Sequence, residues 1–180
     1  QEYMANFNVY EGQIFTVEDK DIIDEFFWHE GCESLAGLDP GWRDPTAFIT
    51  IVYSQRDDCF YIVDEYLETN LSTEVHASYI KENIMKWGIE LIFIDSAAAQ
   101  TAADLAYTYD IPTRKANKDV LAGIATVQVL LLQNRLKICS HCTKTLAAFD
   151  QYQCDERETL TKEKPLHENS HIPEAVRYSL

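Results

Sequence analysis

Two aspartates that follow short apolar runs are the residues of this 180-residue sequence best placed to do chemistry. Asp39 lies in residues 37–41 (GLDPG), a pattern that predicts a strand ending at a tight turn. Asp95 follows residues 91–94 (LIFI) and precedes an alanine-rich segment that predicts a helix. A strand followed by an acid and a helix places a polar group at the carboxyl end of a central strand. A carboxylate held there is easily directed at a metal ion.

Asp39 has a plainer interpretation, because an Asp-Pro-Gly sequence is ordinary turn chemistry. The second strand-end acid, Asp95, favours a metal site over a simple turn. A third group of candidates, His171 and Glu174, lies in a C-terminal segment that predicts a short helix. Residues three apart on a helix can face the same side, so both side chains can approach one site.

The elements expected to position these residues are strands and helices in a mixed order. Three strands with short polar connections predict an antiparallel meander; they end at Asp39 and cover residues 47–54 and 60–65. Asp64 and Glu65 end the third strand; either could join the site, although an acid at the end of a strand is more often solvated. The remaining expected strands are at 91–94, buried on both faces, and at 136–138. The expected helices run from Ser72 or Thr73 to Gly88, over 97–107, over 119–133 with Asn117 as its cap, and over 142–149. A terminal helix is expected to have Pro173 in its first turn.

This order predicts an α/β fold of the RNase H-like class: a mixed sheet, with a three-strand meander and parallel strands, flanked by helices. We expect residues 31–180 to form this domain. Residues 1–30, which open on Gln1 rather than Met and show no clean period, are expected to be a linker with local structure. Residues 150–169 are polar and are expected to form a hairpin or a mobile loop.

The net charge of −15 argues against a domain that grips nucleic acid strongly by itself, because phosphate binding needs clustered Lys and Arg. The one basic cluster is Arg114, Lys115 and Lys118, which is either a solvated loop or a local DNA contact. No apolar run approaches the ~20 residues that span a bilayer, and no leader sequence opens the chain. We therefore expect a soluble, intracellular protein with no membrane partner.

The five cysteines are an odd number, for which free thiols in a reducing compartment are the simplest account. Residues 139–142 (CSHC) are similar to half of a zinc site, but no second pair has the required spacing. Cys142, Leu146 and Phe149 recur at helical spacing. Cys142 is therefore expected to be a core residue and not a metal ligand.

Several of these segments together resemble the C-terminal nuclease domain of the large terminase subunit of tailed bacteriophages. The similar segments, which follow the same order over nearly the whole chain, are residues 1–3 (QEY), 11–15 (EGQIF), 37–41 (GLDPG), 94–97 (IDSA), 118–124 (KDVLAGI) and 171–178 (HIPEAVRY). The first two resemble the exit from a motor ATPase domain, which would lie upstream of residues 1–30.

The resemblance implies a two-metal-ion endonuclease that cuts concatemeric viral double-stranded DNA during genome packaging, with Mg²⁺ or Mn²⁺ as cofactor. It implies Asp39 and Asp95 as the first two metal ligands. The family's third acid is usually Asp in a His-x-x-Asp-Ala-x-Arg-Tyr pattern, and here that position is Glu174. We expect Glu174 to be the third ligand, with His171 as the alternative. For Arg177 and Tyr178, helix packing is the favoured role.

The same resemblance implies partners and a location: viral DNA, the upstream ATPase domain, the small terminase subunit and the portal, in the cytoplasm of the host cell and not in the mature virion. Arg114, Lys115, Lys118 and residues 150–169 are then the expected DNA contacts. Three alternatives stay open at this point. They are a junction resolvase or transposase-type nuclease, an actin-like ATPase, which the six glycines and the lack of a second phosphate loop disfavour, and a packaging or docking module without catalysis.

Overall fold

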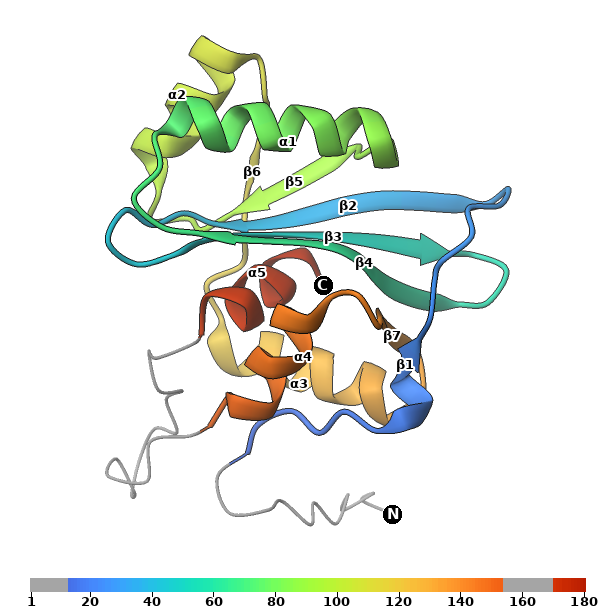
Figure 1. Cartoon of the computed structure of the whole chain (residues 1–180). Helices are drawn as coiled ribbons and strands as arrows, with labels where there is room; N and C mark the ends of the chain where they lie inside the picture. Colours follow the sequence, from blue (N-terminus) through green and yellow to red (C-terminus); the bar gives the residue numbers. More distant parts are fainter. Residues whose placement is uncertain (1–12, 154–169) are drawn as a thin grey trace.

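Three long antiparallel strands form the middle of the sheet, as the sequence predicts. They are β2 (Cys32–Asp39), β3 (Thr46–Ser54) and β4 (Cys59–Glu68). The third strand continues to Glu68, beyond the expected end at residue 65. The computed structural model describes residues 13–153 and 170–180, and Figure 1 shows how they are arranged.

Shorter parallel strands extend this meander on both sides. The sheet order is β1-β7-β4-β3-β2-β5-β6, with β1 (Ile22–Ile23), β5 (Leu91–Ile94), β6 (Arg114–Lys115) and β7 (Leu136–Cys139) added to the meander. The expected basic loop is thus partly an edge strand, β6, which pairs with β5. The prediction that β5 is buried on both faces is wrong, because only Ile92 and Ile94 are buried. The reason is that β5 lies close to the sheet edge, next to a two-residue strand.

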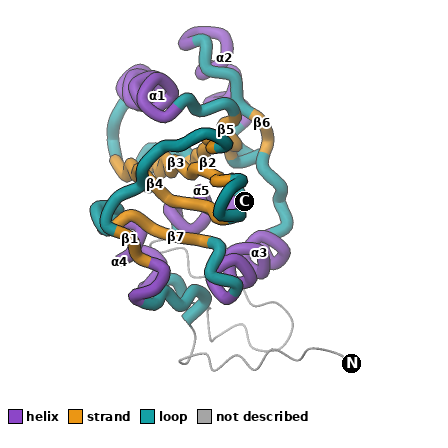
Figure 2. The backbone as a smooth tube through the Cα atoms, turned by 90° about the vertical axis from the view of Figure 1, so that its right-hand side faces the viewer, coloured by secondary structure: helices purple, strands orange, loops and turns teal. Residues whose placement is uncertain are grey.

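Helices cover both faces of the sheet. In Figures 1 and 2, α1 (Thr73–Trp87) and α2 (Ala99–Tyr109) lie on one face, and α3 (Val120–Leu132), α4 (Thr143–Gln151) and α5 (His171–Ser179) lie on the other. Ser72 caps α1 and Gly88 ends it, as expected, whereas the cap of α3 is Asp119 and not Asn117. Asn117 instead accepts a hydrogen bond from the Asp119 backbone N–H. Among the described helices, none has the length and apolar character to cross a membrane.

Residues 13–30 contribute directly to the fold, although they are expected to be a linker. Ile14 and Phe15 are buried in the core between the sheet and α3 to α5, and β1 pairs with β7. A short 3₁₀ turn at Asp19–Asp21 precedes β1. This part of the expected linker therefore belongs structurally to the domain, while an upstream ATPase domain stays a prediction. Residues 1–12 and 154–169, including most of the expected 150–169 loop, lie outside the described residues.

The cysteines of residues 139–142 are core residues, which confirms the prediction for Cys142. Cys139 and Cys142 are completely buried, and burial raises the pKa of the Cys139 thiol to about 11. His141 is also engaged, because its Nε2 lies 2.9 Å from the carbonyl oxygen of Val63. The described cysteines, Cys32, Cys59, Cys139 and Cys142, are all free thiols.

Candidate metal centre

Two neighbouring parallel strands bring Asp39 and Asp95 together. β2 pairs with β5 so that Leu38 is opposite Ile94; Asp39 is the last residue of β2, and Asp95 directly follows β5. The backbone N–H of Asp95 donates to the Leu38 carbonyl at 3.2 Å, which extends the ladder to this level. Adjacent strands are about 4.8 Å apart, so the two acids start from neighbouring positions at the carboxyl edge.

A glycine in β2 lets α5 reach this edge. A Cβ atom on Gly37 would lie 1.7 Å from the carbonyl oxygen of Ala175, so no larger residue fits beneath the helix. Gly37 and Asp39 share one face of β2, because side chains alternate along a strand. The first turn of α5, with His171 and Glu174, is consequently held against Asp39.

The four predicted residues Asp39, Asp95, His171 and Glu174 line one pocket of about 530 Å³. Lys118 and Tyr178 line the same pocket. Burial raises the pKa of Tyr178, and the charges of Asp39, Glu174 and Asp95 raise it further. The structure thus brings together residues separated by more than 130 positions in the sequence.

Asp39 is partly buried and lies close to a histidine. Burial raises its pKa, the nearby charges of Glu174 and Asp95 add to that effect, and the His171 imidazole opposes it. His171 Nδ1 lies 2.8 Å from Asp39 Oδ2, and the same contact raises the pKa of His171. An imidazolium at this position therefore acts as a counter-ion for the buried carboxylate.

Glu174 has its own cation. Arg177, one turn later on α5, forms an ion pair with Glu174, and Tyr152 donates its hydroxyl to Glu174 at 3.2 Å. Arg177 is almost completely buried and packs against α3, where a Cβ on Gly123 would lie 2.1 Å from the arginine Cγ. Arg177 therefore does more than the helix packing that the sequence favours, since it also holds the Glu174 carboxylate.

The donor types of this pocket fit a hard divalent cation, but their present arrangement is not a closed ligand set. Within residues 13–153 and 170–180, no three His, Cys, Asp or Glu side chains converge closely enough to hold a metal ion. The reason is visible in the ion pairs, because Asp39 is bonded to His171 and Glu174 to Arg177. Carboxylate oxygens are the ligands that Mg²⁺ and Mn²⁺ prefer, and a cation would relieve the repulsion that raises the pKa of Asp39.

Two other acids that the sequence offers for this site are engaged elsewhere. Asp64 accepts hydrogen bonds from Lys86, Trp87 and Tyr79 on the α1 face of the sheet. Glu65 accepts the backbone N–H groups of Lys144 and Thr145 at the start of α4. The suggestion that either acid joins the site is therefore wrong, because β4 is separated from β5 by two strands.

The basic residues divide between the pocket and the sheet edge. Lys118 lines the pocket, whereas Arg114 and Lys115 form β6, where Lys115 pairs with Ile94. All three side chains are exposed. Arg114 and Lys115 are consecutive residues of one strand, so their side chains point to opposite faces of the sheet.

Sequence reasoning alone did not assign site roles to Gly37, Tyr152 or Arg177. Gly37 and Arg177 lie in the segments 37–41 and 171–178 that carry the family resemblance, so a signal was present for both. Tyr152 sits outside every such segment, and only the fold brings it to Glu174.

The fold and the pocket together define an RNase H-like domain with an acidic centre at the carboxyl edge of its parallel strands. The chain belongs to the family of terminase RNase H-like domains, whose family model matches residues 36–180. It is 40% identical over 192 residues to the large terminase subunit of Escherichia phage T5, a match that covers 100% of this chain and 44% of that protein. The chain thus spans less than half the length of this curated relative.

Solved structures support the same fold. The large terminase of a thermophilic bacteriophage, solved in complex with ADP, superposes with a TM-score of 0.83 and 23% identity, over 93% of this chain and 44% of that one. The large terminase nuclease domain of bacteriophage SPP1 with bound Mn superposes with a TM-score of 0.67 and 22% identity, over 88% of this chain and 93% of that one.

Proposed function

We propose that this chain is a metal-dependent endonuclease that cuts concatemeric viral double-stranded DNA during genome packaging. One observation carries the proposal: Asp39, Asp95 and Glu174 line a single pocket at the carboxyl edge of an RNase H-like sheet. Membership of the terminase family favours viral DNA over the junction or transposon ends of related nucleases. The terminase family model, which covers most of the chain, favours a nuclease over an actin-like ATPase.

The proposed cofactor is a pair of Mg²⁺ or Mn²⁺ ions bound by Asp39, Asp95 and Glu174. The manganese in the SPP1 nuclease domain supports a divalent metal in this fold. When bound, such a pair would activate a water for attack on the phosphodiester and stabilise the leaving oxygen. Asp39, on which the charges of both other acids act, would hold the ions together with Asp95 and Glu174.

The protein's own side chains prepare this site. His171 holds Asp39 in one orientation through its Nδ1 contact, and Arg177 with Tyr152 holds Glu174. Rotation of Glu174 away from Arg177 would complete the set of three acids. Tyr178, whose pKa is raised by burial and by the acids, stays a neutral hydrogen-bond donor in the pocket. Lys118 is placed to receive a phosphate beside the acids.

The rest of the proposed machine supplies what this acidic chain lacks. With a net charge of −15, the domain has few groups for DNA beyond Arg114, Lys115 and Lys118. An upstream ATPase domain, for which the ADP bound to the terminase of the thermophilic bacteriophage gives support, would present the DNA, and the sequence before residue 13 would lead from it into this domain. The small terminase subunit and the portal complete the proposed partners, and host-cell cytoplasm is the proposed location.

Plasmid nicking and calorimetry test this function together. The wild-type chain should nick supercoiled plasmid in Mn²⁺, and calorimetric titration should show two bound ions. Asp39→Asn should lose both, whereas Asp104→Asn, which changes a partly buried acid on α2 that accepts a hydrogen bond from Gln100, should lose neither. If the wild type binds no ion and leaves the plasmid intact, the chain is instead a docking module whose acids are permanently paired with His171 and Arg177.

A further inference from the structure

Lys118 differs from the other basic residues of the pocket lined by the acids Asp39, Asp95 and Glu174, which we call the acid pocket. The basic residues that line it are His171, Arg177 and Lys118. The first two are paired with acids of the pocket, His171 with Asp39 and Arg177 with Glu174. The Lys118 side chain makes no ion pair or hydrogen bond with any described residue. Its ammonium group is therefore left to bind an anion from outside the chain.

Hydrogen bonds hold the backbone on both sides of Lys118. Before it, the N–H of Ala116 donates to the carbonyl oxygen of Ile94, the last residue of β5, at 2.8 Å. After it, the Asp119 carboxylate caps α3 by accepting the N–H of Ala122 at 3.0 Å. The segment that carries Lys118 is thus fixed between the end of β5, where the acids lie, and the start of α3.

Asn117 closes a turn around Lys118. Its Oδ1 accepts the backbone N–H of Asp119, two residues further along, at 3.1 Å. An asparagine bonded in this way takes the place of one backbone residue of a turn, and so fixes the residue that the bond spans. Asn117 lines the acid pocket together with Lys118. Since Asp119 caps α3, the bond made by Asn117 serves this turn and not the start of the helix.

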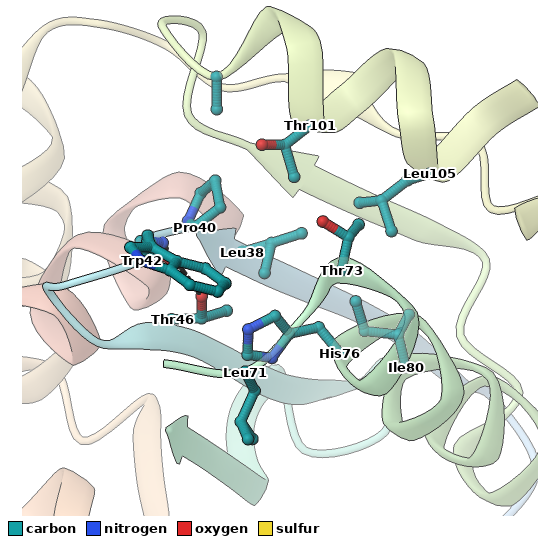
Figure 3. A pocket seen from close by; sticks show the side chains of 12 residues that line it. Leu38, Pro40, Trp42, Thr46, Leu71, Thr73, His76, Ile80, Thr101 and Leu105 are labelled. Atoms are coloured by element: carbon teal, nitrogen blue, oxygen red, sulfur yellow. Dashed lines mark hydrogen bonds between the residues drawn. The ribbon is translucent and has the colours of Figure 1, made fainter. Parts of the chain in front are cut away.

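The cavity on the opposite face of the sheet offers no such cation. Figure 3 shows this cavity, of about 370 Å³, where Leu38 on β2 faces Ile80 on α1. None of the described residues that line it is Asp, Glu, Lys or Arg. Leu38 lines this cavity, whereas Asp39 lines the acid pocket. A phosphodiester is therefore matched to the acid pocket, where an unpaired lysine accompanies the acids.

We propose that Asn117 is a positioning residue of the cleavage reaction, because it holds Lys118 where the ammonium group binds the phosphodiester that is cut. This inference rests on the proposed nuclease function and deepens it. Three carboxylates in one pocket repel a phosphate, and a cation held beside them offsets that repulsion. The lysine side chain is a compact charge on a flexible stem, so the place of its backbone decides where the charge can reach.

Lys118→Gln tests the phosphate contact. Binding of a short DNA duplex would be measured in EDTA over a series of salt concentrations. Loss of one phosphate contact should reduce the slope of log K against log salt by about one. Binding at low salt should weaken by about ten- to hundredfold, the range for a hydrogen bond to a charged group. Lys118→Arg keeps the charge and should retain the slope.

Lys81→Gln is the matched control for this charge change. Lys81 is an exposed lysine of α1, which lies on the other face of the sheet (Figure 1). Its replacement changes the net charge of the chain by the same amount as Lys118→Gln. We expect the salt slope and the low-salt affinity of Lys81→Gln to equal those of the wild type.

Asn117→Ala tests the turn. Loss of one neutral hydrogen bond should slow plasmid nicking in Mn²⁺ by about two- to tenfold. Asn117→Ser should slow nicking less, because a serine hydroxyl forms the same kind of turn more weakly. In a Lys118→Gln background, Asn117→Ala should slow nicking no further, since Asn117 acts through Lys118. Melting curves would show that each variant is folded.

The outcomes separate this inference from the nuclease function. Nicking by the wild type, with an unchanged salt slope and nicking rate in Lys118→Gln, would overturn the phosphate contact and leave the nuclease proposal standing. If the wild type does not nick, the nuclease proposal fails, and an unchanged salt slope in Lys118→Gln would still overturn the phosphate contact. Additive losses of nicking in the double variant would overturn the positioning role of Asn117.

Discussion

Gly37→Ala should destroy the metal centre without touching any of its acids. The added Cβ would lie 1.7 Å from the Ala175 carbonyl oxygen, whereas ordinary contact begins at 3.4 Å. Both partners are backbone, in β2 and α5, so no side chain can move aside. The helix must therefore retreat from the strand by about 1.7 Å, the difference between those two distances.

This displacement of α5 moves His171 and Glu174 away from Asp39, since both residues lie on the first turn of the helix. A misplacement of about 1 Å costs about 100-fold in rate when geometry is critical, so plasmid nicking should fall at least that far. Overpacking of a core costs about 1–3 kcal/mol, which lowers the melting temperature by about 2–4 °C for each kcal/mol in a domain of this size.

Gly88→Ala is the matched control. Gly88 ends α1 with φ of +63°, and nothing lies within 4 Å of a Cβ there. The left-handed conformation costs about 1–2 kcal/mol for a residue with a side chain, so the two variants should lose similar stability. Only Gly37→Ala should lose cleavage. Equal nicking by both variants, or a loss that tracks melting temperature alone, would refute the positioning role of Gly37.

The other predictions concern the acids and their counter-ions. Asp39→Asn and Asp95→Asn should each abolish nicking without lowering the melting temperature of the metal-free chain, because each relieves like-charge repulsion; wild-type rates in either variant would remove that residue from the site. Mn²⁺ should stabilise the folded wild type by about 2.7 kcal/mol when its concentration is 100 times the dissociation constant, and so raise the melting temperature. An equal rise in the melting temperature of Asp39→Asn would place the ions elsewhere. In Mg²⁺, Glu174→Ala should cost far more activity than His171→Ala, with Glu174→Asp retaining activity, and the reverse order would make His171 the third ligand. In EDTA, urea titrations should show that protonated His171 contributes to the free energy of unfolding. This contribution should be fully present below pH 6.5 and should be lost as the pH rises through the raised pKa of His171 in the folded state. His171→Gln should remove this fall, and an unchanged pH profile in that variant would exclude the ion pair with Asp39.

Local patterns were enough to predict the strands and helices that carry the acids. The apolar run at 91–94, the turn residues at 37–41 and the stop signal at Gly88 each act within a few residues. The carboxyl ends of parallel strands meet at one edge, so the proximity of Asp39 and Asp95 followed once β2 and β5 were paired. The structure places both in one pocket with His171 and Glu174, while their role as ligands stays a prediction.

Long-range packing was what the patterns could not provide. β6 is two residues long and exists only because β5 presents an open edge, and β1 exists only because β7 does. Phe15 became core because α4 supplies an aromatic partner, Phe149, whose ring centroid is 4.8 Å away. The approach of Ala175 to Gly37 likewise depends on two segments that lie far apart in the chain. A glycine in a strand does not by itself predict which segment packs against it.

The charges on α5 provide counter-ions for two of the three carboxylates at this edge, those of Asp39 and Glu174. His171, Glu174 and Arg177 are spaced three residues apart, so the helix carries one acid between two cations. His171 neutralises Asp39 across the pocket, and Arg177 neutralises Glu174 within the helix. Under the proposed function, metal binding would therefore be an exchange of counter-ions. Neither cation would have to leave the site, because Arg177 is anchored against Gly123 and His171 lies on the same turn as Glu174.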